Sequence, residues 1–168
     1  AITDRSYILD VCDMLFSRSE NTAKVYALLA PAFAAQFDYA KPGQVIAAIK
    51  KLGFDAVADV AEGADITARA EADELEEKGF LTSSCCPAFV SYIEKNFPSM
   101  KDKISHNLSP AGATAKILKE REPDCKTVFI GPCTAKKTEF QRDEYKNLID
   151  SVITFEELQA LIDGADID

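Results

Sequence analysis

Apolar residues along the chain occur in short continuous runs that alternate with longer segments of helical periodicity. Short apolar runs are typical of strands that are buried on both faces of a parallel sheet. Such runs occupy residues 24–30, 54–60, 80–82, 127–131 and 151–154. Because helical segments separate most of them, the pattern predicts an α/β fold with a mainly parallel sheet of four to five strands flanked by helices.

Helix boundaries are marked by proline, glycine and capping residues. Proline is favoured in the first helical turn and glycine just after the last, while serine and threonine cap the N-terminus. These signals place helices at residues 42–52, 61–78, 87–96 and 110–120, and a capping box at 154–157 starts the last helix. The apolar face expected around the third of these helices consists of Phe89, Val90, Ile93 and Phe97.

The N-terminal segment is predicted to be a separate piece of the chain. The apolar positions of residues 1–16 fall on one side of a short amphipathic helix: Ile8, Val11, Cys12 and Leu15. Residues 17–23 are polar and are predicted to form a loop. We therefore divide the chain into an N-terminal helix and linker, residues 1–23, and a single α/β lobe, residues 24–168.

Composition narrows the functional classes. The net charge of −9 argues against nucleic-acid binding, because phosphate contacts need basic patches. No apolar run approaches the ~20 residues of a membrane-spanning helix, and Asp10 and Asp13 interrupt the first apolar stretch, which does not resemble a signal peptide. The expected location is the cytoplasm, with no membrane partner. The single histidine, His106, excludes a multi-histidine metal site.

Two adjacent cysteines, Cys85 and Cys86, stand directly before Pro87, which is predicted to open a helix. Adjacent cysteines can hardly form a disulfide without severe strain. The N-terminus of a helix stabilises a thiolate and favours anions or a metal-bound thiolate. Since cysteines of cytosolic proteins are more often metal ligands or catalytic thiols than disulfides, this turn is a candidate site.

The cysteine turn is expected to meet two other segments. Ligands of open α/β sheets bind beyond the carboxyl ends of the strands, and residues 30–31, 84–86 and 132–133 all follow predicted strands. Soft thiolates such as Cys86 and Cys133 favour iron–sulfur clusters, zinc or copper, yet four-ligand sites need more donors than these. The residues alone leave open a partial metal site, a redox thiol, or small buried hydrophobes, the interpretation favoured for Cys12 and Cys125.

Two lysines, Lys136 and Lys137, follow Cys133 and are expected either to bind an anionic ligand or to form a solvated pair. Together with this Pro-Cys-Thr-Ala-Lys-Lys stretch, residues 132–137, the Ser-Ser-Cys-Cys-Pro-Ala-Phe turn at residues 83–89 resembles the iron-only (FeFe) hydrogenases. Both motifs have that family's order and spacing. The resemblance extends over residues 24–162 and includes flanking stretches at residues 30–32, 52–55, 64–67 and 109–110.

The resemblance implies a division of labour among the cysteines. Cys86 and Cys133 would be two of the four thiolates that hold the 4Fe–4S part of the H-cluster. Cys85 would pass protons to the diiron subcluster. An onward proton path to the surface is implied for three further residues: Glu71, Ser105 and Glu74. For the two glutamates the alternative is a solvent-facing position on a helix.

Other positions are assigned by the same resemblance. Lys136 would hydrogen-bond a cyanide ligand of the diiron subcluster, and Pro31 and Ala32 would line that subcluster with backbone groups. Gly131 stands where catalytic members usually have a methionine, a change reminiscent of the family's sensory members. The third family motif, which carries the other two cluster cysteines, does not occur before Asp168. The chain therefore matches the first of the family's two lobes.

The chain is thus predicted to be a fragment of an FeFe-hydrogenase-like protein of an anaerobe. Its parent would bind the H-cluster and interconvert H2 with protons and electrons, or sense H2. With two of the four cluster ligands, the isolated chain is expected to be apo and inactive. The expected partner is the second hydrogenase lobe, C-terminal to this chain, while the electron-transfer partner is open. The alternatives are a non-catalytic iron–sulfur or regulatory module built on the same lobe, and a zinc or disulfide-redox protein that uses Cys85 and Cys86.

Overall fold

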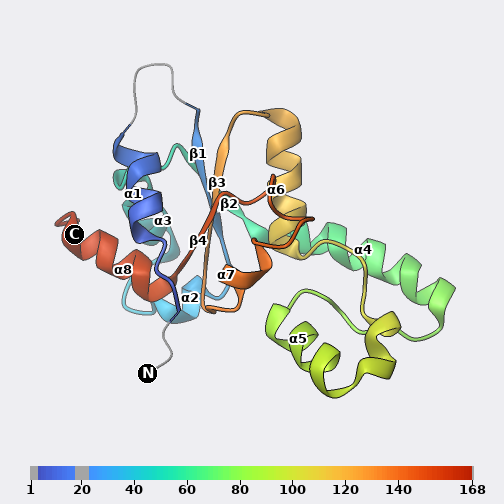
Figure 1. The fold of residues 1–168 in the computed structure, drawn as a ribbon. Coiled ribbons are helices and arrows are strands. Elements are labelled where there is room, and N and C mark those ends of the chain that lie inside the picture. The colour runs from blue at the N-terminus through green and yellow to red at the C-terminus, as the bar shows by residue number, and fades with distance from the viewer. Residues whose placement is uncertain (1–3, 18–22, 168) are drawn as a thin grey trace.

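The computed structural model describes residues 4–17 and 23–167 and confirms the α/β fold (Figure 1). Its parallel strands form one sheet in the order β2-β1-β3-β4. The strands are β1 (Val25–Leu29), β2 (Ala56–Asp59), β3 (Lys126–Gly131) and β4 (Ser151–Thr154). The helices are α1 (Ile8–Phe16), α2 (Phe33–Gln36), α3 (Pro42–Lys51), α4 (Val60–Lys78), α5 (Pro87–Asn96), α6 (Pro110–Arg121), α7 (Lys136–Glu139) and α8 (Phe155–Gly164), with a 3₁₀ helix η1 (Pro98–Lys103).

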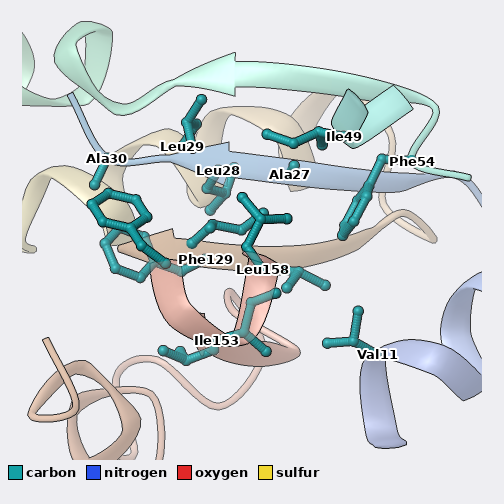
Figure 2. Close-up of a cluster of buried hydrophobic side chains, with 14 of the residues drawn as sticks. Val11, Ala27, Leu28, Leu29, Ala30, Ile49, Phe54, Phe129, Ile153 and Leu158 are labelled. Atoms are coloured by element: carbon teal, nitrogen blue, oxygen red, sulfur yellow. The ribbon is translucent and has the colours of Figure 1, made fainter. Parts of the chain in front are cut away.

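Helices cover both faces of the sheet. α1, α3 and α8 lie on one side of it, and α4 and α6 lie on the other (Figure 1). Figure 2 shows strand residues such as Leu28 and Ile153 among helix residues such as Ile49 and Leu158, and all four are fully buried. Nearly continuous burial along β1, β3 and β4 confirms that these apolar runs are strands covered on both faces, whereas β2, at one edge of the sheet, is only partly buried.

The strand predicted at residues 80–82 is wrong as a member of the sheet. Its one ladder contact is an isolated bridge between Thr82 and Ile104, and Phe80 is 50% exposed. The reason lies in the preceding helix. α4 is 19 residues long, which corresponds to roughly 28 Å at the usual rise per residue. The chain therefore leaves α4 far from the strand ends and pairs locally with the segment after η1.

This local pairing creates a second, smaller hydrophobic cluster. Val90 and Ile93 of α5 pack with Ile104, and Met100 lies partly buried against them. The apolar face predicted for α5 is correct only in these two residues. The other two predicted members, Phe89 and Phe97, are 39% and 44% exposed. Figure 1 shows α5 set apart from the sheet, which explains why the small cluster cannot cover all four side chains.

The predicted helix ends are confirmed where capping residues marked them. Gly53 and Gly79 follow α3 and α4 with positive φ angles of 108° and 70°. Ser109 caps α6 by accepting from the backbone N–H of Gly112, and Thr154 forms the capping box of α8.

The N-terminal segment packs on the lobe through α1. Val11 and Leu15 are buried, and the helix contacts β4. The loop predicted at residues 17–23 lies mostly outside the described residues, and the division of the chain at residue 23 stays a prediction.

Gly63 determines how closely α4 approaches α6. A Cβ atom at this position would lie 2.1 Å from the carbonyl oxygen of Pro110 and 2.3 Å from Oγ1 of Thr114. No side-chain rotation relieves contact with a backbone atom, so the two helices would have to separate. We expect Gly63→Ala to lower the free energy of unfolding by about 3 kcal/mol or more, measured by urea titration.

The matched control is Gly43→Ala in α3, where a Cβ atom meets nothing within 4 Å. This change is expected to be neutral or to stabilise the chain by up to about 1 kcal/mol, because alanine is the better helix former. Equal unfolding midpoints for the two variants would contradict the importance of the close approach at Gly63.

Candidate metal and proton-transfer site

A cavity of about 380 Å³ lies where the carboxyl ends of β1 and β3 meet the start of α5. The two strands are neighbours, and the N–H of Ala30 donates to the carbonyl of Ile130 at 2.9 Å. Residues from all three segments line the cavity: Ala30, Pro31, Phe129, Pro132, Cys133, Cys85, Cys86 and Pro87. The predicted convergence of the three segments is therefore confirmed, although the cysteine turn arrives by a loop and not from a strand of the sheet.

The three thiols at this cavity are free and exposed. Cys86 is the N-cap residue of α5, and Pro87 occupies the first helical turn, as predicted. The carbonyl of Cys85 accepts a hydrogen bond of 3.0 Å from Nζ of Lys136. The cysteine turn is thus tied directly to the segment that follows Cys133.

Lys136 is held in place by a buried carboxylate. Its Nζ lies 2.6 Å from Oε2 of Glu139, whose side chain is only 3% exposed. The hydroxyl of Ser109 donates to the same oxygen at 3.3 Å. Burial raises the pKa of Glu139, against the opposing effect of Lys136. The ammonium also lies 5.8 Å from the ring centroid of Phe129, which lines the cavity.

Lys137 has a different position from its neighbour. Its side chain is 5% exposed, and its Nζ lies 2.6 Å from Asp4 and 2.8 Å from Glu157. The solvated-pair alternative for the two lysines is therefore wrong, because neither ammonium is free in solvent.

The remaining predicted lining residues are placed by β1 and β3. Pro31 lines the cavity directly, whereas Ala32 lies one residue further, at the N-cap of α2. Gly131 ends β3, and a Cβ atom there would lie 2.5 Å from the ring of Phe129. The phenyl ring therefore occupies the space that a side chain at position 131 would need.

Glu71 lies next to the cysteine turn. Its Oε1 accepts from the hydroxyl of Ser83 at 2.8 Å and from the N–H of Ser84 at 3.4 Å. The hydroxyl of Ser83 also accepts from the N–H of Cys85 at 3.4 Å. The structure thus brings the predicted Cys85 and Glu71 together through Ser83, a residue of the cysteine motif for which this position was not predicted.

Glu74 and Ser105 form the other half of the predicted proton path. The hydroxyl of Ser105 donates to Oε2 of Glu74 at 2.9 Å. Asn107 donates to the same oxygen at 2.8 Å, and the hydroxyl of Ser84 donates to the carbonyl of Asn107 at 2.9 Å. Ser84 and Asn107 therefore link the Glu71 half of the network to the Glu74 half.

The carboxylate of Glu74 is stabilised in its charged form. Its side chain is 12% exposed, and burial alone would raise its pKa. Hydrogen bonds from Lys78 and His106 outweigh burial and lower the pKa of Glu74 to about 2. Lys78 follows Glu74 by one helical turn, and this spacing was visible in the sequence. His106 and Asn107 were not predicted, because the loop before α6 brings them to α4.

The thiols of the cavity fit part of a soft-metal site. Thiolates are the donors that iron–sulfur clusters use, and a complete cluster needs four. Within the described ranges, no group of three or more cysteine, histidine or acidic side chains is arranged to hold a metal ion. Cys86 and Cys133 therefore fit a four-thiolate site only as partial ligands.

The other two cysteines lie away from the cavity. Cys12 belongs to α1, and Cys125 is buried just before β3, at the opposite end of that strand from Cys133. Burial raises the pKa of the Cys125 thiol, which disfavours the thiolate that a metal requires.

Comparisons with known proteins show the family to which the chain belongs. The family model for the C-terminal domain of the iron only hydrogenase large subunit matches residues 23–168. Iron hydrogenase 1 of Clostridium pasteurianum is 35% identical over 143 residues, which cover 74% of this chain and 25% of that protein. The cytosolic Fe-S cluster assembly factor NAR1 of Kluyveromyces lactis is 38% identical over 93 residues, which cover 55% of this chain and 20% of that protein.

A solved structure shows the same fold. The apo [FeFe]-hydrogenase HydA1 of Chlamydomonas reinhardtii, variant C377H, superimposes with a TM-score of 0.83 at 27% identity. The match covers 98% of this chain and 49% of that one. The fold and the thiol-lined cavity define a hydrogenase-like α/β lobe. The chain belongs to the iron-only hydrogenase family, within the C-terminal domain of its large subunit, and it spans about a quarter of the length of the curated hydrogenase that it matches.

The low pKa of Glu74 predicts a pH-dependent stability. Since the folded-state pKa of about 2 lies below the ordinary value of 4.5, the charged carboxylate stabilises the fold fully above the ordinary value. This contribution is lost progressively as the pH falls from about 4.5 towards 2. We expect urea unfolding of Glu74→Gln to be less pH-dependent over this range than that of the unaltered chain.

Glu77→Gln, an exposed residue of α4, is the matched control for this titration. Its unfolding should retain the pH dependence of the unaltered chain. If Glu74→Gln and Glu77→Gln gave the same curve, the hydrogen bonds to Glu74 would not stabilise its charged form.

Proposed function

We propose that this chain is the first lobe of an FeFe-hydrogenase-like protein that interconverts H2 with protons and electrons, or senses H2. The observation that carries the proposal is the cavity in which the exposed Cys85, Cys86 and Cys133 lie together with Lys136. Membership of the iron-only hydrogenase family supports it. The complete protein would include a second lobe, C-terminal to this chain, that supplies the missing ligands.

Cys86 and Cys133 are the residues we assign as thiolate ligands. They come from separate segments but line the same cavity, so they can contact one cluster from two sides. The 4Fe–4S and diiron parts of the H-cluster would supply the electron transfer and hydrogen chemistry when bound. Cys86 caps α5, where the helix N-terminus stabilises negative charge on sulfur.

Cys85 is assigned as the proton-carrying thiol of the cavity. Its backbone N–H is linked through Ser83 to the carboxylate of Glu71. Ser105 and Glu74 continue the polar network towards solvent. Titratable groups within hydrogen-bond reach of one another can relay protons. In this proposal the thiol of Cys85 would exchange its proton with the carboxylate of Glu71, and Ser105 and Glu74 would carry it towards the surface.

Lys136 is assigned as the cationic group of the cavity. Its ammonium is fixed by Glu139 and by the carbonyl of Cys85, so it presents a positioned positive charge to an anionic ligand. Pro31 contributes to the wall on the other side, next to β1. The absence of a side chain at Gly131, with Phe129 in its place, supports a sensory-type parent.

A non-catalytic iron–sulfur module is the second candidate. The observation in its favour is the match to a relative whose printed name is an Fe–S cluster assembly factor. Both candidates use Cys86 and Cys133 as thiolate ligands. They differ in turnover, since only the hydrogenase would evolve or oxidise H2 once its cluster is loaded. A cytoplasmic location also belongs to the proposal, while the electron partner stays open. The described helices include none long and apolar enough to cross a bilayer.

Cysteine variants of the full-length parent test the assigned roles. Cys86→Ser should abolish cluster binding, because it removes a thiolate ligand. Cys85→Ser should keep the cluster and lose hydrogen turnover by at least about 10²-fold, because it removes the proton donor. Iron content, absorbance of the cluster and H2 evolution measure the two effects.

Cys12→Ser is the matched control, since this cysteine lies on α1 away from the cavity. It should leave both iron content and turnover unchanged. Equal loss of the cluster in Cys85→Ser and Cys86→Ser would contradict the division of roles.

The isolated chain is predicted to bind no stable cluster. Two thiolate ligands leave a cluster exposed to solvent and to oxidation. After anaerobic reconstitution with iron and sulfide, followed by gel filtration, the chain should retain no stoichiometric iron. Retention of about four iron atoms per chain with a 4Fe–4S absorbance would contradict this prediction.

A further inference from the structure

The only histidine of the chain, His106, lies beside the carboxylate that ends the proposed proton path. It belongs to the loop between η1 and α6, and its side chain is 75% exposed. Its Nδ1 lies 2.8 Å from Oε1 of Glu74 and 2.9 Å from Nζ of Lys78. The inner ring nitrogen is therefore in contact with both a carboxylate and an ammonium group.

These two contacts give Nδ1 a partner in each of its protonation states. When Nδ1 carries a proton, it donates to Oε1 of Glu74. When Nδ1 carries none, its lone pair accepts from the ammonium of Lys78, because an ammonium group can only donate. Nδ1 of His106 therefore keeps a hydrogen-bond partner whether or not it carries a proton. The ring can gain or lose this proton without rearrangement of the loop.

Glu74 connects this ring to the interior. One carboxylate oxygen, Oε1, contacts His106 and Lys78, while the other, Oε2, accepts from Ser105 and Asn107. The carboxylate thus separates an outer pair of basic groups from inner hydroxyl and amide groups. The low pKa of Glu74 means that a proton does not remain on the carboxylate at neutral pH, so a neighbouring base must hold it.

The other charged side chains around the ring come from several elements, and their positive and negative charges nearly cancel. α4 contributes Glu74 and Lys78 directly. The two cavities that His106 lines also include three cationic and four acidic side chains: Lys101, Lys116, Arg142, Glu94, Asp102, Glu120 and Glu144. With the wider charges balanced, the direct contacts with Glu74 and Lys78 set the electrostatics at the ring.

We propose that His106 is the residue through which protons enter and leave the network of Glu74 and Ser105. The inference rests on the proposed function of that network as a proton path. A buffer acid adds a proton to the outer ring nitrogen, Nε2, and the imidazolium passes its Nδ1 proton to Oε1 of Glu74. The ring is then neutral and the proton is on the carboxyl group. Because of its low pKa, Glu74 holds the proton only in passing, until it moves on to the hydroxyl of Ser105 or returns to the ring, and no electrons move.

This role goes to His106 because solvent reaches it more than it reaches Lys78, the other basic partner of Glu74, whose side chain is 26% exposed. Its ring is 75% exposed, whereas the side chain of Glu74 is 12% exposed. An imidazole is also the side chain whose ordinary titration falls nearest to neutral pH, which suits exchange with buffer. His106 acts through Glu74 and is therefore a positioning and exchange residue, not a group in the cavity.

The first test uses the chain itself. Because the chain has one histidine, a ¹⁵N-labelled imidazole gives one pair of ring signals, which belongs to His106, and the couplings to the ring protons distinguish Nδ1 from Nε2. Glu74→Gln should shift the Nδ1 signal at neutral pH, since it removes the charged acceptor. Glu77→Gln, exposed on the same helix, should not shift it. Equal spectra for both variants would show that His106 does not contact Glu74 in solution and would overturn the inference.

The second test uses the full-length parent with its cluster loaded. At low buffer concentration, His106→Ala should lower the rate of H2 evolution roughly tenfold or more, and added imidazole should restore it. Lys116→Ala, at one of the same cavities, should keep the unaltered rate. A rate unchanged by His106→Ala, or a loss that imidazole does not restore, would overturn the proposed exchange role.

The two tests separate the inference from the function on which it rests. A loaded parent with no hydrogen turnover would contradict the proposed function. The ring signals of the chain would then still decide whether His106 contacts Glu74, the contact on which the exchange role depends.

Discussion

The pairing of β1 with β3 is the constraint on which the candidate site depends. These strands are adjacent and parallel, with Leu29 opposite Ile130, so the chain leaves both of them at the same edge of the sheet. Pro31 and Cys133 reach one cavity for this reason alone. The fully buried side chains between the sheet and α3, α8 and α1 stabilise the pairing (Figure 2), so the core holds the position of a cavity whose thiols are exposed.

The second cysteine-bearing segment is positioned by different means. α4 carries the chain away from the sheet, and the segment that follows α4 brings it back to the cavity, where Cys86 is the N-cap of α5. The small cluster of Val90, Ile93 and Ile104 holds this segment together. Its connections to the main lobe are largely polar, among them the bond from Lys136 to the carbonyl of Cys85. The cavity therefore combines one wall set by the main core with another set by hydrogen bonds.

The fold was predicted correctly where the apolar pattern of a segment matches its burial in the structure. The central strands are covered on both faces, so apolar runs were sufficient to find them, and prolines, glycines and capping residues marked the helix ends. The strand prediction for residues 80–82 was wrong because an apolar run does not indicate where the preceding helix ends in space. Phe89 and Phe97 fit a helical period, yet the small cluster beside α5 covers only Val90 and Ile93.

The part of the site that could be predicted from the sequence is the part whose reactive residues stand in short motifs. Cys85, Cys86 and Cys133 are rare residues in marked turns. Parallel strand order places Cys133 at the cavity, whereas Cys85 and Cys86 reach it by a loop. The polar network was harder to predict. Lys78 has a visible spacing from Glu74, but Asn107 and His106 join that network only through the conformation of a loop. Ser83 and Ser84 belong to the cysteine motif, but their place in the network was not predicted, because serines in turns are common and their partners are distant in sequence.

The buried ion pairs of the two lysines of α7 fix the position of this helix more than they stabilise the fold. α7 has four residues, too few to be stable as a helix on its own. Buried ion pairs contribute little net stability compared with apolar packing, but the loss of one partner is costly. Lys137 binds Asp4 and Glu157, and Lys136 binds Glu139, so α7 is fixed on both sides. Because Asp4 precedes α1, the N-terminal segment takes part in holding Lys136 at the cavity.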